Sequence, residues 1–135
     1  MQIKTFLDSL PINFRHEKYF LIQSKSIDFD KLTNLSDIEI NRLQINYPLC
    51  TLNNLKKIRA IAIFKKEIDI PPPAAYLLLH CGVGSVKALS RLKPYELEQK
   101  IRRLERNLRI KTETNINLSI LKNWIKKSHQ SCKSI

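Results

Sequence analysis

Apolar residues in this chain recur three and four positions apart along most of its length, which is the spacing of one face of an α-helix. The pattern is clearest where Leu97, Ile101, Leu104 and Leu108 form one stripe. Alternation of apolar and polar residues, which marks a half-buried strand, is nearly absent. A chain patterned in this way buries its apolar faces by packing helix against helix. We therefore predict an all-α fold.

Prolines and the two glycines of the chain divide this pattern into about seven short helices. Pro11 ends the first one, and the IPPP run at 70–73 cannot continue a helix, because proline lacks a backbone N–H and clashes with the preceding turn. Ser36 and Glu39 have the spacing of a capping box at a helix start. Gly82 has the position of a C-cap glycine after the segment AAYLLLHC.

Two segments need a separate interpretation. The segment FRHEKYFLIQSK fits either a helix built on Phe14, Tyr19 and Ile22 or an extended arm. Farther along, a helix restarts near Thr51, and we expect the segment RAIAIFKKEI at 59–68 to form a further short helix.

An internal repeat suggests how these helices are organised. A shift of 34 residues lays the segment YPLCTLNNLKKI over CGVGSVKALSRL, so that Pro48 falls on Gly82 and Thr51 falls on Ser85. Each copy reads as helix, tight turn, Ser/Thr cap, short helix and then a longer helix, which is a helix-hairpin-helix-like unit. Neither copy has enough apolar residues for a core alone, so we predict that the two pack together in one compact domain. The predicted organisation is an N-terminal helical extension at 1–30, a tandem helix-hairpin-helix-like domain at 31–130 with pseudo-repeats at 35–68 and 70–109 and a closing helix at 117–129, and a disordered tail at 131–135.

Positive charge is concentrated in the second half of the chain. The net charge is +12, of which residues 1–70 carry +3 and residues 71–135 carry +9. We therefore expect an anionic partner to act on the second half. The abundance of Lys, Asn and Ile also indicates an AT-rich genome, which raises the lysine content by itself, so the excess has two explanations.

Composition limits the cellular compartments in which this protein is expected. Cys50, Cys81 and Cys132 are widely spaced and form no C-x-x-C pair, which favours a reducing compartment over a disulfide framework. No apolar run approaches the roughly 20 residues of a membrane-spanning helix. The first residues lack the apolar core of a secretory signal. We expect a protein that is not secreted and not inserted in a membrane, located in an organelle or in the bacterial cytoplasm.

Three short motifs carry a family resemblance. They are the turn GVGSV at 82–86, the helix entry P-x-E-L at 94–97, and the late pair Trp124–Ile125. Over roughly residues 35–130 the chain resembles an uncharacterised family of small tandem helix-hairpin-helix-like proteins of cyanobacteria and algal plastids. The resemblance implies a domain of unknown function and, for localisation, a plastid or a bacterial cytoplasm.

The chain departs from that family's pattern at its first hairpin. The Gly-hydrophobic-Gly-Pro hairpin should fall on residues 69–72, where both glycines are missing. In DNA-binding helix-hairpin-helix modules this hairpin presents backbone N–H groups to a phosphate. Pro71, Pro72 and Pro73 supply no N–H, and Asp69 adds a negative charge. We therefore expect this phosphate grip to be lost.

The GVG turn itself has two interpretations. Lys87 lies near enough in sequence for the turn to act as a phosphate loop. The residues nevertheless match neither the Walker pattern nor G-x-G-x-x-G, and no strand precedes them. We favour a structural turn formed by Gly82, Gly84 and Ser85.

A basic surface on the last helices is the main candidate site. In the helix at 94–109, three Glu residues stand four positions before Lys100, Arg102 and Arg109, a spacing that favours ion pairs. This leaves Arg103 and Arg106 without such a partner, and aromatic residues for base stacking are not found on this face. The predicted nucleic-acid-binding or partner-binding residues are Lys87, Lys100, Arg102, Arg103, Arg106, Arg109, Lys122, Lys126 and Lys127.

No arrangement of catalytic or metal-binding residues is recognisable. His80 with Cys81, and His129 with Cys132, each lack a second pair at zinc-site spacing. We expect no metal, no cofactor and no enzymatic activity, and we expect Trp124 to belong to the core.

Two functions remain. The first is a non-catalytic basic protein that contacts RNA or DNA phosphates through its C-terminal basic helices. The alternative is a protein–protein adaptor or assembly factor that docks on a larger complex, such as a ribosome or a photosynthetic assembly. In the adaptor, the segment IPPPAAY is expected to form a rigid contact ridge.

Overall fold

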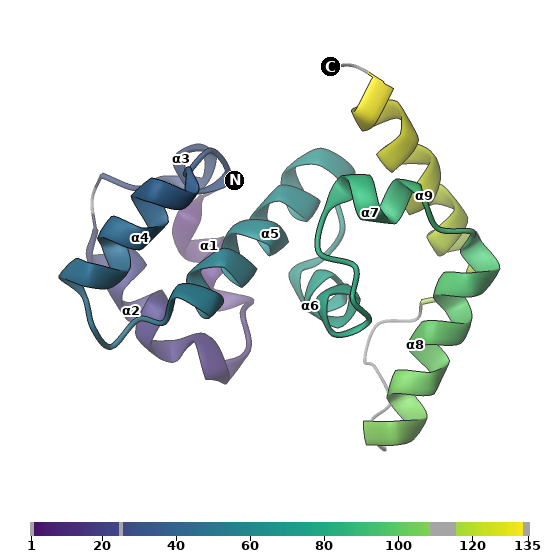
Figure 1. Ribbon diagram of the computed structural model, residues 1–135, viewed down its shortest axis with the longest axis horizontal. Coiled ribbons are helices and arrows are strands. Elements are labelled where there is room, and N and C mark those ends of the chain that lie inside the picture. The colour runs from purple at the N-terminus through teal and green to yellow at the C-terminus, as the bar shows by residue number, and fades with distance from the viewer. Residues whose placement is uncertain (1, 25, 109–115, 134–135) are drawn as a thin grey trace. The chain divides into compact units, whose positions relative to one another are not determined.

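The computed structural model is all helical, as predicted, and we describe residues 2–24, 26–108 and 116–133. Over these ranges the chain forms nine α-helices and one 3-10 helix, with no strand (Figure 1). The chain divides into two compact units, Met1–Ile63 and Phe64–Ile135. The helices are α1 (Ile3–Asp8), η1 (Ile12–Phe14), α2 (Arg15–Gln23), α3 (Phe29–Thr33), α4 (Asp37–Asn46), α5 (Leu52–Ile68), α6 (Pro72–His80), α7 (Val86–Ser90), α8 (Pro94–Leu108) and α9 (Leu118–Lys133).

The segment before residue 25 is a helix rather than an extended arm. Phe14 belongs to the short η1, so the buried face of α2 is set by Phe20 and Leu21. The expected face was wrong, because Tyr19 and Ile22 are exposed. Together with α1 and α3, these buried residues make the first unit's own core.

Two side chains fix the start of α4 in the first unit. The predicted capping box is confirmed: the Ser36 hydroxyl accepts the Glu39 N–H at 3.2 Å, and the Glu39 carboxylate accepts the Ser36 N–H at 3.2 Å. The bond from the Ser36 backbone N–H is the main cause that lowers the pKa of the Glu39 carboxyl, and the Ser36 side chain lowers it further. Arg59 of α5 donates to the Leu35 carbonyl at 2.8 Å and to the Asp37 carboxylate at 2.7 Å, which ties α4 to α5.

The two copies of the predicted repeat share their caps but differ in the helices that follow. Thr51 accepts the Asn54 N–H at 3.1 Å, and Ser85 accepts the Ala88 N–H at 3.0 Å. After Thr51 the chain forms one helix of 17 residues, so the separate short helix at 59–68 was wrong. No glycine or proline interrupts α5, whereas α7 has five residues and gives way to α8 at Pro94.

The second unit is built around α9, which packs against both α7 and α8 (Figure 1). Trp124, Leu121 and Ile125 of α9 are buried, as are Leu89 of α7 and Leu97 of α8. Trp124 is 6% exposed and therefore belongs to the core, as predicted. The opposite faces of α8 and α9 are left to polar and basic residues.

Candidate nucleic-acid interface

The GVG turn ends α6 in a Schellman motif. Gly82 has φ 86°, the left-handed region that favours glycine. Its N–H donates to the Leu79 carbonyl at 3.1 Å, and the Val83 N–H donates to the Leu78 carbonyl at 2.9 Å. Val83 and Leu78 are both buried, which supplies the apolar contact typical of this motif. Both N–H groups are therefore hydrogen-bonded within the chain and are not available to a phosphate. The Ser85 hydroxyl is also engaged, because it accepts a hydrogen bond from α7 as its N-cap.

The IPPP segment forms the start of α6 and presents few hydrogen-bond donors. Pro71 is the N-cap, and Pro72 and Pro73 are the first two helical residues, so none of the three has an N–H to offer. Asp69 has φ 62° and accepts a hydrogen bond from Lys65 at 2.6 Å, which lowers the pKa of its carboxyl. This helix start therefore lacks the backbone donors that grip a phosphate in helix-hairpin-helix modules.

The exposed side of α8 carries an aromatic residue as well as arginines. Tyr95, Arg102, Arg103 and Arg106 are all exposed. Positions 95, 99, 102 and 106 recur at helical spacing, which places Tyr95 on the same side as Arg102 and Arg106. Tyr95 lies in the first turn of α8, away from the cluster of charges, and was therefore not predicted from the sequence. Extending the helical spacing back to residue 95 would have found it.

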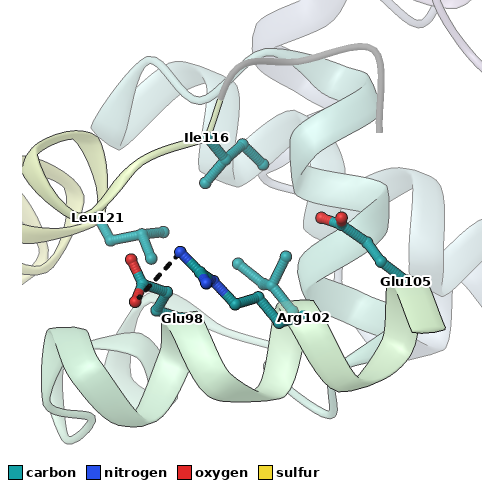
Figure 2. Close-up of a pocket in the computed structure, with 6 residues that line it drawn as sticks. Glu98, Arg102, Glu105, Ile116 and Leu121 are labelled. Atoms are coloured by element: carbon teal, nitrogen blue, oxygen red, sulfur yellow. Dashed lines mark ion pairs between the residues drawn. The ribbon is translucent and has the colours of Figure 1, made fainter. Parts of the chain in front are cut away.

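Arg102 lines a pocket of about 310 Å³ (Figure 2). Its guanidinium approaches the Glu98 carboxylate at 3.7 Å, and it extends along the pocket toward Glu98 and Leu121. Glu105 also lines this pocket, together with Ile101 and Ile116. Two carboxylates and one arginine make the pocket a poor site for an anion. The expected pair between Glu98 and Arg102 is present, and its arginine is exposed, so it adds little stability.

A second groove, of about 540 Å³, has a basic rim. Pro94 and Ile125 contribute apolar surface, and Lys122, Lys126 and His129 of α9 line the groove with Gln130. Residues 122, 126 and 129 follow one another at helical spacing, so they share one side of α9. Among the described residues, no carboxylate lines this groove. The structure thus brings Lys122 and Lys126 together and adds His129, whose sequence pattern suggested only a metal ligand.

The other predicted basic residues lie apart from this groove. The positive charge of Lys127 helps to lower the pKa of the Asp69 carboxyl, so Lys127 faces the end of α5. Lys100 lies near Cys81 at the end of α6. Burial is the main cause that raises the pKa of the Cys81 thiol, and the positive charge of Lys100 opposes this rise. Lys87 is exposed on α7. Arg109 lies outside the described residues.

No group of three or more His, Cys, Asp or Glu side chains suited to a metal ion occurs in the described part of the chain. His80 packs edge-on against Tyr76, with ring centroids 4.5 Å apart. The Cys132 thiol contacts the Ser90 hydroxyl at 3.9 Å. Within the same ranges, no helix is both long and apolar enough to cross a bilayer.

The chain matches the model of the family described as a domain of unknown function, DUF4332, over residues 16–131. It therefore belongs to that family. No curated protein and no solved structure matches the chain.

Proposed function

We propose that this member of the DUF4332 family is a non-catalytic basic protein that binds RNA or DNA phosphates through its second unit. Four cations carry the proposal: Arg103 and Arg106 of α8, and Lys122 and Lys126 of α9. All four side chains are exposed. Among the described residues, none of the four forms an ion pair with a carboxylate. Exposed cations without carboxylate partners attract the phosphate backbone and release its counterions on binding.

The arrangement favours binding that does not depend on base sequence. Arginine and lysine on helix faces contact phosphates, and phosphate contacts position a protein without reading bases. The usual phosphate grip of the hairpin is absent at the proline-rich start of α6. The proposed contact therefore runs through side chains of α8 and α9 rather than through backbone N–H groups.

The salt dependence of binding tests the proposal. Affinity for RNA and DNA fragments should fall linearly with the logarithm of salt concentration, with a slope of about 0.9 per phosphate contacted on duplex DNA. The double substitution Arg103→Ala, Arg106→Ala should reduce that slope by up to about two. A matched control is Lys4→Ala with Arg42→Ala, which removes two exposed cations from the first unit and should leave the slope unchanged. Undetectable binding at about 50 mM salt would refute nucleic-acid binding, because electrostatic attraction is weakly screened there.

A protein–protein adaptor is the second candidate, and the surface of the first unit favours it. Large apolar side chains are exposed there on several elements. They are Ile12, Tyr19, Ile22, Ile38, Ile45, Tyr47 and Leu49. Ile38 and Ile45 stand seven positions apart on α4 and therefore share one side of that helix. Neighbouring exposed apolar residues are a common mark of protein interaction sites. In the segment IPPPAAY, expected to form a contact ridge, Ile70, Pro72, Ala74 and Ala75 are buried, whereas Pro71 and Pro73 are exposed.

A pull-down from the native source tests the adaptor. After nuclease treatment, a direct protein partner should remain bound, whereas a partner bridged by RNA should be lost. The double substitution Ile45→Lys, Leu49→Lys should abolish the retained partner, because it places charge on the exposed apolar surface. Retention by this variant would argue against the first unit as the docking surface.

A further inference from the structure

The groove between Pro94 and α9 has features that phosphate attraction alone does not require. It is an open site of about 540 Å³, within the roughly 300–1,000 Å³ range of small-molecule sites. We infer that this groove receives one unpaired nucleotide, so that the protein prefers single-stranded over duplex nucleic acid. This inference rests on the proposed function and specifies its substrate class.

The apolar surface of the groove suits a base. Pro94 and Ile125 both line the groove; Pro94 is half-buried and Ile125 is only 5% exposed, so Pro94 offers the larger apolar surface of the two. Bases have apolar faces that pack on such side chains once they are unstacked. The Gln130 amide also lines the groove, and its donor and acceptor groups can bond a base edge. A base therefore finds both a face contact and an edge contact here.

The rim of the groove suits the phosphate attached to that base. Lys122 and Lys126 stand four residues apart on α9, and His129 follows on the same side. The pocket beside Arg102 offers a contrast within the same unit, because Glu98 and Glu105 line it. A phosphate is attracted to the first site and repelled by the carboxylates of the second.

A single strand fits this arrangement better than a duplex. In a duplex the base faces are stacked and the edges paired, so a base reaches a groove only after costly extrusion. Tyr95 follows Pro94 directly and is 63% exposed, which leaves its ring free for a neighbouring base. Base–aromatic stacking of this kind is a general device of single-strand binders.

The test compares a mixed-sequence single strand with the duplex of the same sequence, by fluorescence anisotropy at one salt concentration. The single strand should bind more tightly. Gln130→Glu places a carboxylate in the groove and should weaken single-strand binding about fivefold. The matched control Asn123→Asp adds the same charge to an exposed position of α9 that does not line the groove, and its effect should be smaller. Tyr95→Ala should weaken single-strand binding about fivefold or more and leave duplex binding unchanged.

The outcomes separate the two claims. Equal binding of single strand and duplex, or equal loss in Gln130→Glu and Asn123→Asp, would overturn the groove as a nucleotide site while the proposed function stands. Absence of binding to either form at about 50 mM salt would overturn both. Circular dichroism of each variant, compared with the wild type, distinguishes loss of the site from loss of the fold.

Discussion

The two units of this chain have different surfaces. Residues 1–63 carry nine Lys and Arg against six Asp and Glu, whereas residues 64–135 carry fifteen against six. Seven of the eight large apolar side chains that are exposed in the described ranges belong to the first unit, and only Tyr95 belongs to the second. Charge and apolar exposure are therefore separated along the chain. This separation supports the proposal that the second unit binds an anionic polymer and the alternative that the first unit docks on a protein.

The interiors differ as well. The first unit buries Glu17, which is 1% exposed, together with the thiol of Cys50. One Glu17 carboxylate oxygen accepts the Asn54 side-chain amide at 2.9 Å, and the other has no partner among the described residues. In the described part of the second unit, the buried polar side chain is that of Ser128, which is neutral and donates to the Ile125 carbonyl at 2.6 Å. An ionisable group thus lies inside the less charged unit.

The largest expected effect is on the free energy of unfolding, and it distinguishes a buried aromatic residue of the second unit from an exposed one. Trp124→Ala should lower the free energy of unfolding by about 3–5 kcal/mol, because it leaves a cavity between α9 and its neighbours. Tyr95→Ala should change it by less than about 0.5 kcal/mol, since the ring is exposed. Urea unfolding followed by circular dichroism measures both. Similar losses in the two variants would mean that Tyr95 is also a core residue and would remove it from the binding surface.

A smaller effect concerns the buried thiol of the first unit. Burial, with a further contribution from the Glu17 charge, raises the pKa of Cys50 from its ordinary value of 9.0 to about 11. Between these pH values the native state retains a proton that the unfolded state has lost, so the free energy of unfolding should fall as pH rises from 9 to 11. Cys50→Ala should show a shallower decline in the same urea titrations. Identical declines in wild type and variant would show that Cys50 does not titrate differently in the folded state.

The smallest effect tests the GVG turn. Gly82→Ala should cost about 1 kcal/mol of stability, because alanine is strained at φ 86° although no atom lies within 4 Å of its added Cβ. Gly84→Ala is the matched control: it also finds open space, and its φ lies outside the left-handed region, so it should be neutral or slightly stabilising. Thermal unfolding of both variants measures the difference. Equal stability of the two would contradict the Schellman assignment.

Local signals in the sequence predicted much of the fold. Ser36, Glu39, Thr51 and Ser85 mark helix starts because their side chains replace missing backbone partners, an effect confined to one turn. Gly82 marks a helix end for the same local reason. The length of α5 was missed because the repeat suggested a break that no glycine or proline enforces. The two copies resemble each other in their caps but not in the residues that end a helix, because Pro94 has no proline counterpart within α5.

The candidate site was only partly predictable. The exposed cations of α8 and α9 follow from helical spacing, but their neighbours come from other elements. Pro94 and Lys126 line one groove although 32 positions separate them, and Lys127 turns toward Asp69. Such pairings depend on how α9 packs against α7 and α8, which no local pattern specifies. The apolar surface of the first unit was missed because Tyr19 and Ile22 were expected to face the core.

The central claim is that nucleic acid binds the second unit and not the first. An NMR titration of the full chain with a short single strand at low salt tests it most directly, because each backbone amide reports separately. We expect amide shift changes to concentrate around the exposed residues of α8 and α9, from Tyr95 to Arg106 and from Lys122 to Gln130. Residues 3–63 should remain unperturbed. Shift changes concentrated in the first unit, around α2 and α4, would contradict the account.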